Sequence, residues 1–395
     1  CTMRSILIIM ASFAAGALIL DSCHKDVPVQ EAVSVIPGTV DAAKDMASYK
    51  LEVTANCTWS VTTEGDDGQA VYWITPDRSS GHDRAIVTIR VNENKYNDSR
   101  SASVVFTTPG GQRAVAIVTQ KGDAGGSDAP GEATLCLGTY NLRMSNLDTD
   151  DVNKWSVRKE RLKQSINDCG FDVFGIQEVS TEMQTWLESE YKGSYTFRFF
   201  SPYSQNGNGN KANGIGYRTS AFALSDWHFF WATGTPDTMS TNDTGSSGSF
   251  NRGGCCCILT HKQSGARFFY MNTHACLNNE PNAALAPVYI EQEKRFNPGG
   301  LPSFFVGDMN ARPEYQASET YRSYWKDSYQ TALRKSGASA SYNGFTTVSG
   351  KYRIDYIYHR GNGITINDFC ISNKLYDGKY ASDHFPVIVN CKLSK

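Results

Sequence analysis

Hydrophobic and polar residues alternate with a period of two along much of the first third of the chain. The alternating segments lie at residues 48–55, 58–63, 85–92, 102–108 and 114–120. A period of two places the apolar side chains on one face of a β-strand, and turn-rich stretches such as EGDDG and TPGGQ separate the segments. Since no helical stripe interrupts them, residues 33–121 are predicted to form an antiparallel, immunoglobulin-like β-sandwich.

The pattern changes after a flexible stretch. Residues 122–131, GDAGGSDAPG, have the composition of a linker and of a domain boundary. Beyond this linker, short apolar runs typical of buried strands alternate with amphipathic helical segments. Strands are expected at 134–141, 171–178, 267–272, 303–306, 353–359 and 387–393, and helices at 155–168 and 180–191. Strands flanked by outer helices favour a layered α/β or α+β domain over residues 132–395.

Residues near the start of the sequence are typical of an export signal. Arg4 precedes an apolar run, 6–20, that is too short to cross a membrane comfortably. The motif LDSC, which ends at Cys23, resembles a bacterial lipobox, in which the cysteine receives a lipid. We therefore expect a signal peptide over 1–22, a tether over 23–32 and an outer membrane lipoprotein that faces the cell surface or the periplasm. A plain signal peptide with an incidental cysteine is the alternative.

Composition and charge agree with ordinary globular domains. Of the 395 residues, 40% are hydrophobic and 20% are charged, which argues against disorder. The 38 basic and 40 acidic residues nearly cancel, so no whole-protein field that would attract nucleic acid is expected. Residues 1–131 hold 11 basic and 15 acidic residues, a net charge of −4, and residues 132–395 hold 27 and 25, a net charge of +2.

The eleven cysteines do not form a pattern of metal ligands or of a disulfide framework. There is no CxxC pair, and nine cysteines are left after Cys1 and Cys23 are set aside, so at least one is unpaired. The run Cys255–Cys257 lies in an apolar stretch that is typical of a buried strand. We interpret these cysteines as small apolar residues rather than as redox or metal-binding groups.

Polar residues lie at or near the ends of several predicted strands of the second domain, with Asp355 inside one strand and Asp383 and His384 just before another. They are Asn141, Glu178, His274, Asp308, Asn310, Asp355, Asp383 and His384. A carboxylate beside a run of buried apolar residues is costly unless it is paired or binds a metal. A single such residue would be read as a cap or a turn former, but a set of them predicts a functional site on one rim of the sheets.

The residue types in this set suit the hydrolysis of a phosphate ester. Mg²⁺ prefers oxygen ligands and keeps several waters, so one or two carboxylates are enough to hold it. A phosphate ester needs its negative oxygens neutralised and a water activated. Histidine transfers protons near neutral pH, and a carboxylate partner fixes its tautomer.

The motifs that contain these residues identify a family resemblance. TYNLR, GIQE, GIGYR, NTH, GDMN, RIDYIY and SDHFPV occur in the order found in the endonuclease/exonuclease/phosphatase family, which is related to deoxyribonuclease I. The resemblance covers about residues 134–394. It implies an α/β four-layer sandwich, in which helices flank two central mixed β-sheets. It also implies Mg²⁺-dependent hydrolysis of a phosphomonoester or phosphodiester, with Mn²⁺ as a substitute.

The resemblance implies a metal site and sites of substrate contact. Glu178 is implied as the principal Mg²⁺ ligand, with Asn141 and Asp383 beside it. Asn141, Arg252 and Tyr217 are implied as substrate-binding residues, although a surface role for Arg252 and Tyr217 is an equal alternative. The family often has an aspartate where this chain has Cys276, so the surroundings of the nearby histidine are expected to differ.

The remaining motif residues receive catalytic roles from the same resemblance. Asp308 would orient or deprotonate the attacking water, and Asn310 would position the phosphate. His384 would act as general base or acid, with Asp355 orienting it. His274 would donate to the phosphate or to the leaving group.

The first domain resembles the BACON domain. Cys57–Val61, Trp73–Pro76, Val104–Phe106 and Val118–Gly122 carry this resemblance, which implies contact with carbohydrate or mucin. A spacer without ligand is the alternative, because a tryptophan at such positions is more often a core residue.

The substrate stays open among nucleic acid, phospholipid head groups and phosphorylated glycans. The rival function is a carbohydrate-binding surface protein whose phosphoesterase-like domain is inactive.

Overall fold

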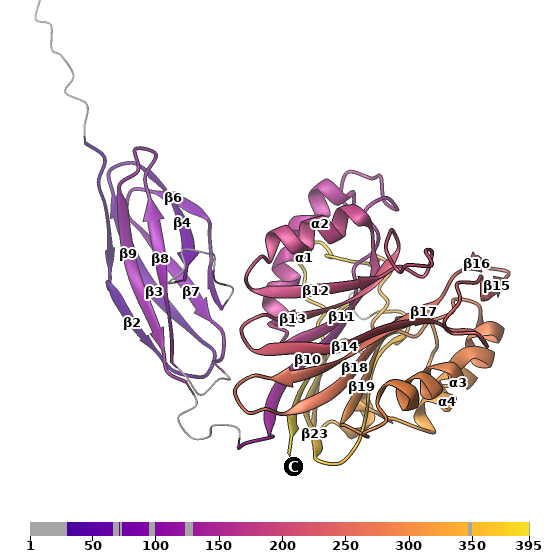
Figure 1. The fold of residues 1–395 in the computed structure, drawn as a ribbon. Coiled ribbons are helices and arrows are strands. Elements are labelled where there is room, and N and C mark those ends of the chain that lie inside the picture. Colours follow the sequence, from indigo (N-terminus) through magenta and orange to yellow (C-terminus); the bar gives the residue numbers. More distant parts are fainter. Residues whose placement is uncertain are drawn as a thin grey trace, which may run out of the picture.

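The computed structural model describes residues 30–65, 71, 73–94, 99–122, 129–346 and 350–394. The predicted signal peptide, Cys23 and most of the tether lie outside the described residues. None of the helices in the described part of the chain is both long enough and apolar enough to cross a membrane. Figure 1 shows a β-sandwich followed by a larger domain of sheets and helices.

The described residues of the β-sandwich form nine strands. They are β1 (Val33–Ile36), β2 (Thr39–Ala42), β3 (Ala47–Ala55), β4 (Thr58–Glu64), β5 (Ile74–Pro76), β6 (Ser80–His82), β7 (Ala85–Val91), β8 (Arg100–Thr107) and β9 (Arg113–Gln120). One sheet has the order β1-β3-β7-β5 and the other the order β2-β9-β8-β4-β6. The apolar residues of the period-two pattern fill the space between the sheets, where the rings of Trp59 and Phe106 lie 5.5 Å apart, edge to face. This confirms the predicted all-β sandwich and places Trp59 in the core. The sandwich is not antiparallel throughout as predicted, because β2 and β9 pair in parallel.

Two larger sheets form the centre of the second domain. One contains β10 (Ala133–Asn141), β11 (Val173–Val179), β12 (Tyr195–Phe200), β13 (Ala212–Arg218), β21 (Arg334–Gly337), β23 (Ile364–Ile371) and β24 (Val387–Leu393). The other contains β14 (Phe222–Trp231), β17 (Gly253–His261), β18 (Arg267–His274), β19 (Ser303–Asp308), β20 (Lys326–Asp327) and β22 (Asp355–Arg360). Their orders are β12-β13-β11-β10-β24-β23-β21 and β14-β17-β18-β19-β22-β20. Both sheets are mixed, because β10–β11 and β18–β19 pair in parallel and their other neighbours are antiparallel.

Helices cover the outer faces of both sheets. They are α1 (Trp155–Cys169), α2 (Thr181–Glu190), α3 (Asn279–Phe296), α4 (Gln316–Arg322) and α5 (Ser328–Thr331), and the short strands β15 (Asp243–Gly245) and β16 (Gly248–Phe250) form a separate hairpin. Helices α1 and α2 lie on one side of the paired sheets, and α3 and α4 lie on the other (Figure 1). The predicted helices at 155–168 and 180–191 are therefore present.

Three apolar cores separate the four layers. The core between the sheets contains Cys255 and Cys257, whereas Cys256 points the other way, toward α3 and α4. Leu162 and Ile166 of α1 lie in the core on the opposite outer face. Replacing a fully buried leucine such as Leu162 with alanine costs about 2–5 kcal/mol in folded proteins. The layers confirm the predicted four-layer α/β sandwich.

The cysteines behave as apolar residues, as predicted. None of the nine cysteines of the described residues forms a disulfide, and Cys255–Cys257 are fully buried. Burial raises the pKa of the Cys256 and Cys257 thiols well above the ordinary value, which keeps them protonated and unreactive.

Candidate active site

Strand register gathers three of the predicted residues at one end of the six-stranded sheet. His274 pairs in register with Asp308 across β18 and β19, and Asp308 pairs with Asp355 across β19 and β22. On the seven-stranded sheet, Asn141 ends β10 opposite Gln177 of β11, which places Glu178 next to it. The ends of two different sheets therefore form one rim, as the strand-end pattern predicts.

Three residues of this rim adopt an unusual backbone conformation. Glu178 has a φ of 59° and lies where the register of β11 with β13 shifts between Ile176 and Val179. Arg143 and Asn310 have φ values of 57° and 46°. A left-handed conformation costs a residue other than glycine about 1–3 kcal/mol and is concentrated at functional sites. The shift in β11 turns the Glu178 side chain into the cavity instead of along the sheet.

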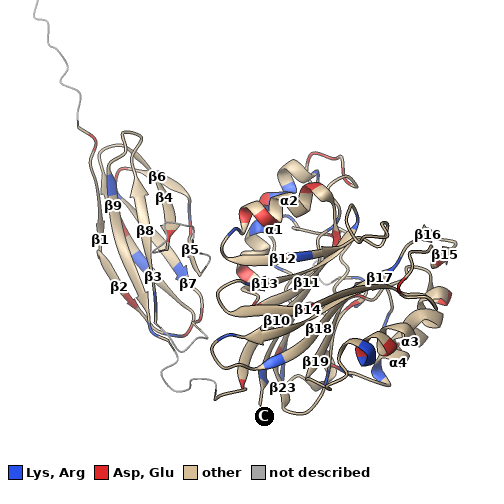
Figure 2. Cartoon of the chain, viewed as in Figure 1, with Lys and Arg blue, Asp and Glu red and all other residues tan. Residues whose placement is uncertain are grey.

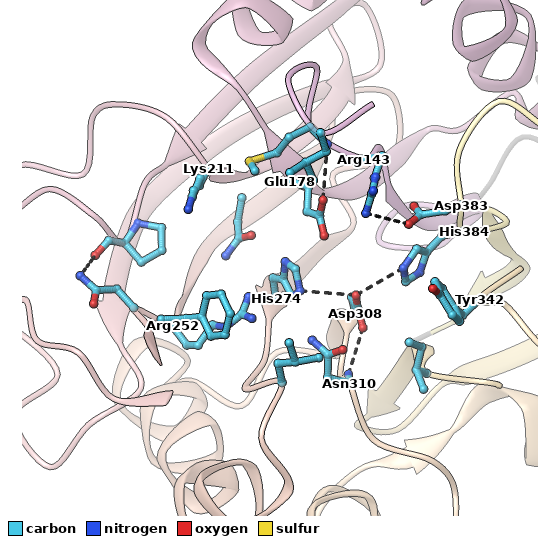
Figure 3. A pocket seen from close by; sticks show the side chains of 18 of the residues that line it. Arg143, Glu178, Lys211, Arg252, His274, Asp308, Asn310, Tyr342, Asp383 and His384 are labelled. Carbon is cyan, nitrogen blue, oxygen red and sulfur yellow. Dashed lines mark hydrogen bonds and ion pairs between the residues drawn. The ribbon is translucent and has the colours of Figure 1, made fainter. Parts of the chain in front are cut away.

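Asp308 is the centre of the hydrogen-bonding network (Figure 3). Its Oδ2 accepts a hydrogen bond from Asn141 Nδ2 at 3.1 Å and lies 3.5 Å from His274 Nε2 and 3.8 Å from His384 Nε2. Its Oδ1 accepts from the Asn310 backbone N–H at 2.9 Å. Burial, followed by the charge of Asp355, raises the pKa of Asp308 to about 7. Asp308 is thus able to exchange a proton near neutral pH.

Asp355 and His384 form the predicted dyad. His384 Nδ1 lies 2.9 Å from Asp355 Oδ2, and the side chains are 6% and 0% exposed. Burial alone would lower the pKa of His384, but the carboxylates of Asp355 and Asp308 outweigh it and raise the pKa to about 10. Asp355 begins β22, His384 precedes β24 of the other sheet, and the contact crosses between the sheets.

Glu178 and Asp383 supply the second group of carboxylates. Glu178 Oε1 accepts a hydrogen bond from Asn141 Nδ2 at 3.2 Å. Asp383 Oδ2 lies 3.2 Å from Arg143 Nη1. Burial raises the pKa of Asp383, the charge of His384 opposes this rise, and the nearby Glu178 adds to it. A cation placed between the two carboxylates would relieve their repulsion.

The donor atoms around Glu178 suit a hard divalent cation. Carboxylate oxygens of Glu178 and Asp383 are the ligands that Mg²⁺ and similar ions prefer. Asp308, Asp355 and His384 also bring possible ligand atoms within 4.8 Å of one another. Asp355 and His384, however, already bond each other, and a histidine nitrogen is a poor ligand for such an ion. The chemistry of the ligand atoms therefore favours the Glu178 side of the site for a metal.

Asn141 presents its amide nitrogen to the carboxylates, whereas the predicted role of a metal ligand would use its amide oxygen. Its Oδ1 accepts the backbone N–H of Arg143 at 3.0 Å, and its Nδ2 donates to both Glu178 and Asp308. In this arrangement the amide nitrogen faces the carboxylates. Asn141 thereby holds Glu178 and Asp308 in a defined relation to each other.

Arg252 and His274 lie next to each other in the site (Figure 3). Arg252 Nε donates to Asp243 Oδ2 at 3.1 Å, and the arginine side chain is 10% exposed. Burial, with the charges of Arg252 and His384, lowers the pKa of His274 well below its ordinary value. His274 is therefore a neutral imidazole there. Cys276 is buried nearby, and burial raises the pKa of its thiol to about 12. The thiol is therefore uncharged, unlike the aspartate that the family often has at this position.

These residues line a single cavity of about 630 Å³ (Figure 3). Seven of the predicted residues contribute to its wall, namely Glu178, Arg252, His274, Asp308, Asn310, Asp383 and His384. Asn141 and Asp355 lie directly behind the wall and bond to residues that line it. The described part of the chain therefore brings together nine of the ten predicted residues.

Tyr217 is the exception. It was expected on the rim, but it is 8% exposed, belongs to the core between the sheets and does not line the cavity. Residues four apart on a strand share a face but lie about 13 Å apart along it. Asn213, at the other end of β13, lines the cavity in its place.

Other residues that line the cavity were not predicted. Arg143 belongs to the TYNLR motif, and its side chain is held by Asp148 through two hydrogen bonds of 3.1 and 3.0 Å. Arg158 of α1 does not line the cavity, but it is fully buried and donates to the backbone oxygen of Arg143 at 2.6 Å. Its helical spacing gave no signal of this role, because charged residues on a helix are normally solvent-exposed. Lys211, Arg312, Tyr342 and Tyr352 also line the cavity.

Comparisons with known proteins agree with this geometry. Residues 138–384 match the model of the endonuclease/exonuclease/phosphatase family. Residues 58–121 match the BACON model, which describes a candidate N-terminal binding domain. A search of curated proteins found no match.

Solved structures share the fold of the second domain. An endonuclease/exonuclease/phosphatase family protein from Bacteroides thetaiotaomicron is 24% identical, with a TM-score of 0.61 over 67% of this chain and 96% of that chain. A mannosyl-6-phosphatase from the same organism is 24% identical, with a TM-score of 0.59 over 65% and 99%. The catalytic domain of human Nocturnin, with bound sulfate, is 19% identical, with a TM-score of 0.52 over 66% and 95%. At these identities the likeness shows a common fold.

Proposed function

The chain belongs to the endonuclease/exonuclease/phosphatase family, whose members hydrolyse phosphate esters, and we propose that it is an exported, lipid-anchored, Mg²⁺-dependent phosphoesterase. The observation that carries this proposal is the convergence of Asp355, His384, Asp308 and Glu178 in one cavity. Two histidines within 4 Å of the buried carboxylate of Asp308 suit proton transfer, which favours an active enzyme over the inactive alternative.

The metal would place positive charge beside the phosphate oxygens and would stabilise the negative charge that develops during the reaction. Glu178 and Asp383 would hold it, and Mn²⁺ would substitute for Mg²⁺. Asn141 fixes Glu178 relative to Asp308, so the metal side and the proton-transfer side of the cavity keep a constant separation.

The protein's own residues account for the movement of protons. Asp308, with a pKa near neutrality, orients the attacking water and accepts its proton. His384, charged and held by Asp355, neutralises a phosphoryl oxygen and donates its proton to the leaving-group oxygen, which balances the proton that Asp308 takes from water. Asn310 lies beside Asp308 in the cavity and donates to the phosphate. His274, which is neutral, donates a hydrogen bond to a phosphoryl or leaving-group oxygen.

A phosphorylated glycan is the substrate that we propose first. One structurally similar protein is a mannosyl-6-phosphatase, and the BACON match supports contact of the first domain with carbohydrate or mucin. Acidic and basic residues are interspersed over the helices and strands in Figure 2, an arrangement that does not favour a long duplex nucleic acid. Nucleic acids and phospholipid head groups are the other substrates to test.

The experiment is hydrolysis of p-nitrophenyl phosphate and bis(p-nitrophenyl) phosphate with Mg²⁺ or with EDTA. We expect Mg²⁺-dependent release of p-nitrophenol, and the preferred compound reports monoester or diester specificity. Glu178→Gln should remove most activity and raise the Mg²⁺ concentration required, because a charged ligand becomes neutral. Glu188→Gln, an exposed change on α2, is the matched control. Wild-type turnover by Glu178→Gln at limiting Mg²⁺ would refute the metal assignment, and a complete lack of activity would favour the carbohydrate-binding alternative.

A further inference from the structure

Three arginines line the cavity, and only one of them lacks an acidic partner in the described part of the chain. Arg143 pairs with Asp148 and Asp383, and Arg252 pairs with Asp243. Arg312 forms no ion pair or side-chain hydrogen bond with any described residue. An arginine that is not neutralised, in the wall of a substrate cavity, is suited to bind an anionic group.

The Arg312 side chain is nevertheless held in place. Its guanidinium lies 3.7 Å from the centre of the Tyr352 ring and 5.7 Å from that of Tyr315. A guanidinium stacked on a ring directs its N–H groups outward around its edge, where they remain free to donate. The loop is fixed as well, because Tyr356 Oη donates to the oxygen of Ala311 at 2.9 Å.

Arg312 lies close to the reaction centre but outside it. It follows Asn310 by two residues, so their Cα atoms are at most about 7 Å apart. A row of rings leads from His384 to it. The His384 and Tyr342 rings are 5.1 Å apart, and the Tyr342 and Tyr352 rings are 6.5 Å apart and parallel. A phosphate at His384 and a second group at Arg312 would therefore belong to one ligand of moderate length.

We propose that Arg312 forms a second anion subsite, which binds a phosphate or carboxylate on the alcohol side of the scissile ester. This inference rests on the proposed phosphoesterase function and narrows its substrates to esters that carry a further negative charge. The guanidinium of Arg312 covers one face of the Tyr352 ring. Arg312 is thus a specificity residue and takes no part in proton transfer.

The test compares phosphorylated ligands with and without a second anionic group. The first series begins with glucose 6-phosphate, which carries no second anion. In the same series, 6-phosphogluconate carries a carboxylate as the second anion, and glucose 1,6-bisphosphate carries a phosphate. Thymidine 5′-phosphate and thymidine 3′,5′-bisphosphate form a second pair. Their dissociation constants are measured by calorimetry with the full chain in EDTA, where hydrolysis is stopped. In at least one series, the doubly anionic ligand should bind about tenfold more tightly or better. The carboxylate and phosphate arms identify which anion is preferred.

Two variants and a control locate the effect. Arg312→Gln should abolish the preference and leave binding of the singly phosphorylated ligand within about twofold, whereas Arg312→Lys should keep part of the preference. Arg360→Gln is the matched control, because Arg360 also stacks on a tyrosine, 4.4 Å from the Tyr324 ring, but does not line the cavity. It should keep the whole preference.

Two results would overturn the subsite. One is the lack of any preference by the wild-type protein in both series, including a failure to bind. The other is a preference that survives in Arg312→Gln or that is lost in Lys211→Gln instead. Hydrolysis of p-nitrophenyl esters is measured on the same preparations. Normal hydrolysis without a preference would refute this inference and leave the phosphoesterase proposal intact. A preference without hydrolysis would refute the phosphoesterase proposal and the place of the subsite beside a scissile ester, and would leave only the binding of an anion by Arg312.

Discussion

Replacing Asp355 with asparagine tests the proposed mechanism most sharply. The substitution keeps the size of the side chain and removes its charge, so His384 loses the partner that stabilises its protonated ring. The bond is 2.9 Å long and the two side chains are 0% and 6% exposed, so solvent does not screen the interaction. A hydrogen bond to a charged group contributes about 1.5–3 kcal/mol. Because about 1.4 kcal/mol corresponds to a tenfold change in rate, Asp355→Asn should slow turnover about 10- to 100-fold.

The assay is a double-mutant cycle on the p-nitrophenyl ester that the protein prefers. His384→Ala should cost about 10²-fold or more, the usual scale for a positioned acid–base group. If Asp355 acts only through His384, the double variant should be no more than about threefold slower than His384→Ala alone. The limb of the pH–rate profile that reports His384 should also move to lower pH in Asp355→Asn, since the carboxylate raises the pKa of that histidine.

A matched variant separates this role from stability. Asp327 is another buried carboxylate at the same sheet, and it pairs with Arg353 at 2.7 Å outside the cavity. Asp327→Asn should lower the melting temperature and leave the pH profile unchanged. Fully additive losses for Asp355→Asn and His384→Ala, in variants that melt as the wild type does, would show that the two residues work independently and would refute the dyad.

Three further predictions concern location, domains and pH. Cys23→Ala should release the protein from the membrane fraction, because the acyl chains are lost; a variant that still pellets after a carbonate wash would contradict the lipid anchor. A chain of residues 130–395 should fold and keep catalysis, since every candidate site residue lies in it; an unfolded or inactive product would mean that the sandwich completes the core or the site. Burial, aided by the charge of Lys326, lowers the pKa of His359 to about 4. The folded state therefore favours the neutral ring. The contribution of His359 to the free energy of unfolding is complete above the unfolded pKa of about 6.5, and it is lost as the pH falls toward 4, by about 3 kcal/mol in all. His359→Gln should lose that part of the pH dependence in urea unfolding at pH 7 and 4.5, and an unchanged dependence would refute the assignment.

Much of the fold follows from local sequence patterns. The period-two segments of the first domain became strands of a sandwich, and the helices at 155–168 and 180–191 formed close to their predicted bounds. The interpretation of Cys255–Cys257 as apolar residues also holds. These features depend on which side chains are apolar and how they repeat, and both are properties of neighbouring residues in the chain.

Family motifs located most of the candidate site without the structure. The residues at strand ends do meet in one cavity, because the motifs record positions that the fold brings together. Arg312 escaped notice, although it lies two residues from the GDMN motif, since an arginine in a loop gives no sign of whether an acid neutralises it. Only the described contacts show that Arg143 and Arg252 have acidic partners and that Arg312 has none among them.

The sequence alone determined the two kinds of domain, the order of the motifs and the chemistry of the site residues. The tertiary structure decided which of these residues face the cavity. Tyr217 lies in the core, because its position along β13 is far from the rim. The motif that contains Tyr217 does not reveal this distance. Asp355 and His384 meet across two sheets, and a register shift in β11 turns Glu178 inward. Sheet packing and strand register are long-range properties, since they depend on residues far apart in the chain, and local patterns therefore do not specify them.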